Sequence, residues 1–166
     1  MSSMEMTDCS IIKELRQLSA ITSGRQRAYY EFLLSKAIPV HISPLREVFN
    51  DNEIQRIKSA VNPQAKECFK NAALVCSLFP DRVRYVEGRF TVCRTFSTEH
   101  AWNRLGEKYF DVTMELALEG NPEDEEYIAL GDYTNEELLE YLLDAKVYGN
   151  IIIWQRFIEQ TERLKP

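Results

Sequence analysis

The chain has 166 residues, of which 45% are apolar and 11% aromatic. This length and composition are typical of one globular domain with a hydrophobic core, so we expect residues 1–166 to form a single domain. The net charge of −6 and the pI near 5.1 argue against nucleic acid as a partner, because no basic block is present to attract phosphate groups.

Membrane, disulfide and metal functions are also disfavoured. The longest apolar run, Ile151–Trp154, is too short to span a bilayer. The polar, acidic start at residues 1–8 lacks the pattern of a secretory signal, so we expect a cytoplasmic location. The four cysteines show no CxxC spacing and are expected to be reduced: Cys9, Cys68, Cys76 and Cys93. With only two histidines, nothing in the sequence indicates a metal or an organic cofactor.

The N-terminal part, residues 1–61, is predicted to be helical. Apolar residues at helical spacing predict helices over 8–22, with Asp8 as N-cap, and over 27–37. Ser43 and Pro44 resemble an N-cap followed by proline at the first helical position, and the helix they open has an uncertain break near residues 50–52.

The central part, residues 62–115, changes from helical to alternating periodicity. A helix is expected over residues 66–79 and strands over 83–87 and 90–96, with Gly88 as a turn or bulge. A hairpin follows over residues 98–113, and residues 114–118 are read as an extension of its second strand.

The C-terminal part, residues 116–166, returns to helical patterns. An acidic loop and a short apolar segment at 127–130 precede a capping box formed by Thr134 and Glu137, whose helix ends at Gly149. Residues 151–158 fit either a terminal helix or a strand. The order of helices, an antiparallel sheet of about four strands and then helices predicts an α+β fold.

The hairpin places a histidine beside a carboxylate. A two-residue turn at Leu105-Gly106 puts His100 directly opposite Asp111, and a turn one residue later makes them diagonal neighbours. In both registers the two side chains share a face of the sheet, because side chains alternate along a strand. A histidine next to a carboxylate forms two thirds of a nucleophilic triad.

Cys68 is the best candidate for the third member. It lies early in the helix over 66–79 and precedes His100 in the chain, and a thiol becomes a good nucleophile at a helix start near an imidazole. This placement requires either that residues 62–65 form a turn before the helix or that His100 does most of the activation of the thiol. Cys76 lies two turns deeper on the apolar face, where a thiol packs as a small hydrophobe.

These residues resemble the transglutaminase-like branch of the papain-like cysteine enzymes. That family pairs a cysteine-bearing helix with a strand reading H-x-W-x and a following strand reading D-x-T. The corresponding residues here are Cys68, H-A-W-N at 100–103 and D-V-T at 111–113. The resemblance implies a papain-like core in which the nucleophile helix packs on a small antiparallel sheet, with additional N- and C-terminal helices.

The resemblance also implies roles for the three residues. Cys68 would attack an amide or thioester carbonyl, His100 would act as general base and then acid, and Asp111 would hold the imidazole. The Cys68 backbone amide is a candidate oxyanion donor, the Gln64 side chain is a second, and Trp102 is a candidate site wall that is equally well explained as core. Peptidase, amidase, deamidase and acyltransferase chemistries on a peptide, protein or small amide all fit.

Two other interpretations remain open. His100 and Asp111 form an ordinary cross-strand polar pair in the first, with Cys68 a buried thiol. The second is a non-catalytic protein-binding module on the same fold, which an exposed apolar patch would favour. The residues expected in such a patch are Tyr29, Tyr30, Leu138 and Tyr141.

Overall fold

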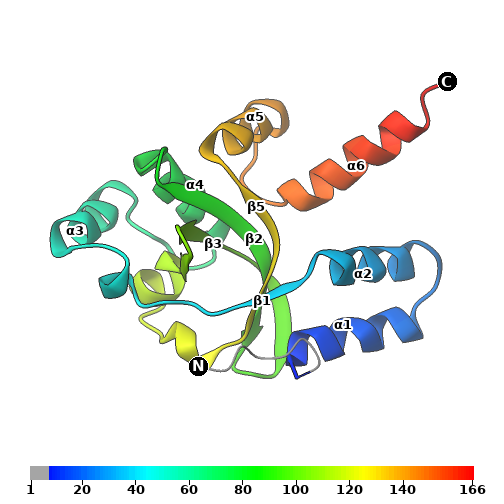
Figure 1. The fold of residues 1–166 in the computed structure, drawn as a ribbon, viewed down its shortest axis with the longest axis horizontal. Helices are drawn as coiled ribbons and strands as arrows, with labels where there is room; N and C mark the ends of the chain where they lie inside the picture. The colour runs from blue at the N-terminus through cyan, green and yellow to red at the C-terminus, as the bar shows by residue number, and fades with distance from the viewer. Residues whose placement is uncertain (1–7) are drawn as a thin grey trace.

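The computed structural model describes residues 8–166 as an α+β fold with a five-stranded antiparallel sheet (Figure 1). The strands follow the order β1-β5-β2-β3-β4 and are β1 Ile38–Val40, β2 Val83–Val92, β3 Phe96–Leu105, β4 Lys108–Phe110 and β5 Tyr127–Tyr133. The α-helices are α1 Ser10–Ile21, α2 Gly24–Lys36, α3 Asp51–Ala60, α4 Cys68–Leu78, α5 Asn135–Ala145 and α6 Ile151–Arg163. Within residues 8–166, no helix has the length and apolar character needed to cross a membrane.

The sheet curls until its two edges meet. Ile42, just after β1, forms a parallel bridge to Tyr109 in β4, and the Ser43 N–H donates a 2.7 Å hydrogen bond to the Tyr109 carbonyl. The inward face of the curl is filled by one cluster of apolar side chains: Ile42, Val86, Phe90, Trp102, Met114, Tyr127 and Ala129. The curl therefore encloses a small core of its own.

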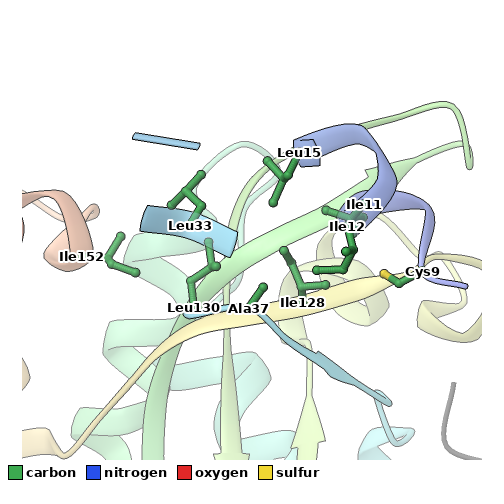
Figure 2. Close-up of a cluster of buried hydrophobic side chains, with 9 residues drawn as sticks. All are labelled: Cys9, Ile11, Ile12, Leu15, Leu33, Ala37, Ile128, Leu130 and Ile152. Atoms are coloured by element: carbon green, nitrogen blue, oxygen red, sulfur yellow. The ribbon is translucent and has the colours of Figure 1, made fainter. Parts of the chain in front are cut away.

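The other face of the sheet is covered by helices. At one end, α1 and α2 pack on Ile128 and Leu130 of β5 in the cluster that Figure 2 shows, which also includes Ile152 of α6. At the other end, α4 places its small residues Ala72 and Ala73 against the strands. Helix α4 is fixed there because the buried Asn103 side chain of β3 donates a 2.9 Å hydrogen bond to the Ala72 carbonyl.

At Gly88 the bulge alternative is confirmed, because the pairing of β2 with β5 shifts register between Glu87 and Gly88 while β2 continues to Val92. Two other strand predictions were wrong. The chain turns at Cys93 and Arg94, which both have positive φ, so the strand predicted over 90–96 is divided between β2 and β3. Residues 113–117 form a π-helical turn rather than a strand extension.

The apolar segment at 127–130 has a larger role than its length suggested. It belongs to β5, which lies between β1 and β2 and is hydrogen-bonded to both. The sheet therefore has five strands instead of about four.

Most of the predicted helices are present, but several begin or end at other residues than predicted. Ser43 is not an N-cap, because its backbone is bonded to β4. A short 3-10 helix, Leu45–Glu47, follows, and α3 starts at a capping box of Asn50 and Glu53. Cys9 replaces Asp8 as the N-cap of α1.

In the C-terminal part, the Thr134 side chain caps α5 as predicted, but the helix ends at Lys146 in the left-handed conformation, before Gly149. Residues 151–163 are helical. The residues named for an exposed apolar patch do not form one. Leu138 and Tyr141 are only 1% and 3% exposed and belong to the core under α4.

The close approach of strands at Gly88 generates a stability prediction. A Cβ at this position would lie 1.9 Å from the Ile128 carbonyl oxygen and 2.5 Å from a ring carbon of Trp102. Gly88→Ala is therefore expected to cost about 3 kcal/mol of unfolding free energy, measured by urea denaturation. Gly106→Ala is the control, because its Cβ would meet nothing within 4 Å. Only the strain of alanine at a φ of +59° remains, and it should cost about 1 kcal/mol of unfolding free energy. Equal losses in the two variants would contradict this packing.

Candidate active site

The hairpin adopts the second of the two predicted registers. Leu105 pairs with Lys108, so the turn is Gly106-Glu107, with Gly106 at a φ of +59°. Asp111 follows directly after β4 and lies diagonally across from His100 on the same face. The His100 Nε2 and Asp111 Oδ2 atoms are 2.7 Å apart, which is the contact that the hairpin predicts.

The Asp111 carboxylate is fully buried, and each of its oxygens is hydrogen-bonded. The Tyr127 hydroxyl of β5 donates to Oδ2 at 2.8 Å, and the Met114 backbone N–H donates to Oδ1 at 3.1 Å. Burial alone would raise the pKa of Asp111, but the charge and hydrogen bond of His100, helped by these two donors, lower it below its ordinary value. Asp111 is therefore held as a carboxylate.

The His100 imidazole is buried as well. Its ring stacks on Phe90, with ring centroids 4.0 Å apart. Burial would lower the pKa of His100, but the charge and hydrogen bond of Asp111 outweigh it, and Cys68 contributes in the same direction. Together they raise the pKa of His100 from 6.5 to about 10, so the imidazole carries a proton at neutral pH.

Cys68 is the first residue of α4. Residues 62–67 lie outside the helix, which is the condition that a nucleophile at this position requires. Because the first backbone N–H groups of a helix have no acceptor within it, the Cys68 N–H faces the region in front of the helix. The thiol is half-buried and lies close enough to His100 to contribute to the raised pKa of the imidazole.

The buried Asn71 side chain fixes the start of α4. Its amide donates to the Gln64 carbonyl at 2.8 Å, and its oxygen accepts from the Gln64 N–H at 3.2 Å. The same amide donates to the Thr113 hydroxyl at 3.0 Å, which ties the first turn of α4 to the residues after Asp111. Since β4 pairs with β3 only at residues 103–105, the edge of β3 beside His100 is left free for Cys68 to approach.

The remaining predicted site residues lie in different environments. The Gln64 side chain is exposed and donates to the Asn62 carbonyl at 3.1 Å, so it points along its own turn. Trp102 is 1% exposed and packs against Tyr127 in an edge-to-face contact at 5.2 Å, as a core residue next to His100. Cys76 is buried, and burial raises its pKa to about 12.

Sequence reasoning missed two residues of this site. Tyr127 was part of an apolar segment with no indication that its hydroxyl reaches Asp111, since that contact depends on the pairing of β5 with β2. Asn71 was one polar residue among several on a predicted helix, and its burial follows only from the docking of α4. Neither residue carries a local signal.

Comparisons of the chain with protein-family models, curated proteins and solved structures find no match. Among residues 8–166, no group of three or more histidine, cysteine, aspartate or glutamate side chains could hold a metal ion.

The hydrogen bond from the Tyr127 hydroxyl to the Asp111 carboxylate predicts that Tyr127→Phe changes the unfolding free energy in a pH-dependent way. The lowered pKa of Asp111 contributes stability that is present above its unfolded-state value and is lost as the pH falls through its folded-state value. Tyr127→Phe removes one of the causes and should cost about 2 kcal/mol of unfolding free energy at pH 7. This difference from the unmodified protein should shrink in denaturation series below about pH 4.

Tyr133→Phe is the matched control for this measurement. Tyr133 is another buried tyrosine of β5, and its hydroxyl donates to the Gln155 side chain at 3.1 Å, which carries no charge. Loss of this hydrogen bond in Tyr133→Phe should cost about 1 kcal/mol of unfolding free energy at every pH. A cost for Tyr127→Phe that is equally independent of pH would rule out the proposed support of Asp111.

Proposed function

We propose that the protein is a thiol-dependent hydrolase or acyltransferase that acts on an amide or thioester through Cys68, His100 and Asp111. The observation that carries this proposal is the 2.7 Å contact between the buried His100 and Asp111 side chains, and the contribution of Cys68 to the raised pKa of the same imidazole supports it. The resemblance to the transglutaminase-like branch of the papain-like enzymes supports the same assignment. Substrates would be a peptide, a protein or a small amide.

The raised pKa of His100 refines its role. Because the imidazole is protonated at neutral pH, His100 enters the reaction as an acid, and an imidazolium beside a thiol favours attack by the thiolate without a separate general base. The thiolate attacks the substrate carbonyl carbon, and the electron pair of the C=O bond moves to oxygen. In this proposal the Cys68 backbone N–H, at the start of α4, donates to this oxyanion.

The tetrahedral intermediate then breaks down in two stages. His100 donates its proton to the leaving amine or thiol as the carbonyl re-forms, which leaves a thioester on Cys68 and a neutral imidazole. Water or an amine next attacks the thioester, His100 accepts the proton of this nucleophile, and the thiolate is released with an acid or a new amide. Asp111 stays ionised throughout and stabilises the imidazolium.

A non-catalytic protein-binding module is the second candidate. Large apolar side chains are exposed on α5, on the following loop and on α6, with Leu143, Val147 and Phe157 exposed by 79%, 58% and 64%. Surfaces of this kind are common at protein interfaces. On this reading the thiol of Cys68 has no special reactivity, and the partner is a protein.

Reactivity towards iodoacetamide distinguishes the two. Cys68 is expected to react at pH 6 at least about ten times faster than Cys93, the exposed cysteine in the β2–β3 turn, because only Cys68 has an imidazolium beside it. Peptide mass spectrometry of the alkylated protein gives both rates from one sample. His100→Gln should bring the two rates together. Equal rates in the unmodified protein would exclude the triad and favour the binding module.

A second measurement tests acyl transfer itself. Incubation with a simple aryl thioester should add one acyl group to Cys68, with release of the aryl thiol, and Cys68→Ala should abolish both. Fast alkylation without any acylation by a panel of thioesters would mean a reactive thiol that is not a nucleophilic catalyst.

A further inference from the structure

An exposed apolar patch runs along α5, the loop after it and α6. Most of the large apolar side chains that are exposed within residues 8–166 lie in this stretch, and the others are spread over the rest of the chain. Single exposed apolar residues are normal, but a group of them marks a contact surface. We call this group the C-terminal patch, and its members are Leu139, Leu143, Val147, Tyr148, Ile153, Phe157 and Leu164.

Two sides of α6 contact neighbouring helices. On one side, Trp154 packs edge-to-face on Tyr141 of α5, with ring centroids 5.4 Å apart. On another side, the Arg156 guanidinium lies 5.1 Å from the centroid of the Phe32 ring in α2. The helix therefore lies between α5 and α2.

The outward side of α6, between these two contacts, is apolar. Ile153 and Phe157 lie one helical turn apart on this side, and Leu164 follows two turns later. These three residues form the apolar stripe of α6 and are 39%, 64% and 84% exposed. Every residue from 159 to 166 is exposed, and Figure 1 shows this end of α6 projecting away from the other elements. Because helices in proteins gain most of their stability from packing, an apolar stripe that packs on nothing in its own chain indicates a partner.

The part of the C-terminal patch on α5 is flanked by carboxylates. Leu139 and Leu143 are one turn apart and are 45% and 79% exposed. Glu136 and Glu140 lie one turn apart beside them and are exposed too. Helix α5 contains no basic residue, and within residues 8–166 neither glutamate forms an ion pair. This surface therefore suits an apolar helix that has basic residues along its edge.

Helix α6 has the opposite charge beside its apolar stripe. Arg156 and Arg163 directly precede Phe157 and Leu164 in the chain, so both arginines flank the stripe on the same side. The two glutamates of α6 lie two positions from these stripe residues, on the far side of the helix. In the part of the chain that the structure describes, Arg163 forms no ion pair. The stripe of α6 therefore complements α5 in both apolar character and charge.

We propose that a second copy of this chain covers the C-terminal patch, with α6 of each protomer lying on α5 of its partner. The two contacts are equivalent, as in a twofold-symmetric dimer. In each contact the leucines of α5 pack on the stripe of α6, and the glutamates of α5 face Arg163. A bilayer fits this surface less well, because anionic headgroups repel the carboxylates of α5. The proposal is independent of the chemistry proposed for Cys68.

Sedimentation velocity over a concentration series tests the proposal on the full chain. The unmodified protein should change from monomer to dimer as its concentration rises. Phe157→Ser removes the central side chain of the stripe and should raise the dissociation constant of the dimer at least about tenfold. Phe96→Ser is the matched control and should leave this constant unchanged, because Phe96 is similarly exposed, at 57%, but lies at the start of β3, outside the patch.

Charge reversal tests the pairing of α5 with α6. Glu140→Arg and Arg163→Glu should each raise the dissociation constant about fivefold, because each change places like charges at both equivalent contacts. The double variant, Glu140→Arg with Arg163→Glu, restores opposite charges at both contacts. Its dissociation constant should return to within about twofold of the unmodified protein.

Several results would overturn the proposal. A protein that stays monomeric up to its solubility limit has no such dimer. If that monomer co-sediments with phosphatidylcholine vesicles, the patch belongs to a membrane surface, and otherwise it belongs to a different protein. A dimer that Phe157→Ser and Phe96→Ser weaken equally, or that neither weakens, forms through another surface. A double variant that dimerises no more tightly than the two single variants excludes the pairing of α5 with α6.

Discussion

The buried contact between His100 and Asp111 is the interaction on which the rest of the site depends. Removing two ionised groups from water is costly, and a buried ion pair seldom repays this cost in stability. Here the cost is offset in part because both carboxylate oxygens accept further hydrogen bonds, from Tyr127 and from the Met114 backbone. A pair that is maintained in this way, beside a half-buried thiol, is better explained by chemistry than by stability.

The fold brings these groups together by two long-range features. Antiparallel pairing puts β5 next to β2, and the curl of the sheet lets Tyr127 reach across the enclosed core to Asp111. The π-helical turn that follows Asp111 offers the Thr113 hydroxyl to Asn71, which links the start of α4 to the hairpin. Cys68 is therefore placed by contacts that also hold the His100–Asp111 pair.

The parts of the site that were predictable from the sequence are those determined by local rules. The turn at Gly106 leaves two registers with a two-residue loop, and both of them put His100 and Asp111 on the same face. The break at residues 62 and 63 also indicated that a helix begins shortly afterwards, but α4 starts at Cys68, two residues later than predicted.

The rest depended on pairing between distant segments. The β2–β3 turn at Cys93 and Arg94 contains no glycine, proline, asparagine or aspartate, so its left-handed residues had no sequence signature. Ser43 had the pattern of a helix cap, but its backbone bond to β4 takes precedence over that local preference. The support of Asp111 by Tyr127 required knowing that β5 is a central strand.

The protonation state of His100 at neutral pH tests the site most directly. Nitrogen-15 NMR of the imidazole, assigned with a variant that lacks His41, distinguishes an imidazolium from either neutral tautomer. A pKa of about 10 for His100 means that both ring nitrogens carry protons at pH 7.5, and that Asp111→Asn removes one of them. A neutral imidazole at pH 7.5 in the unmodified protein would contradict an imidazolium beside Cys68, and with it the proposed chemistry.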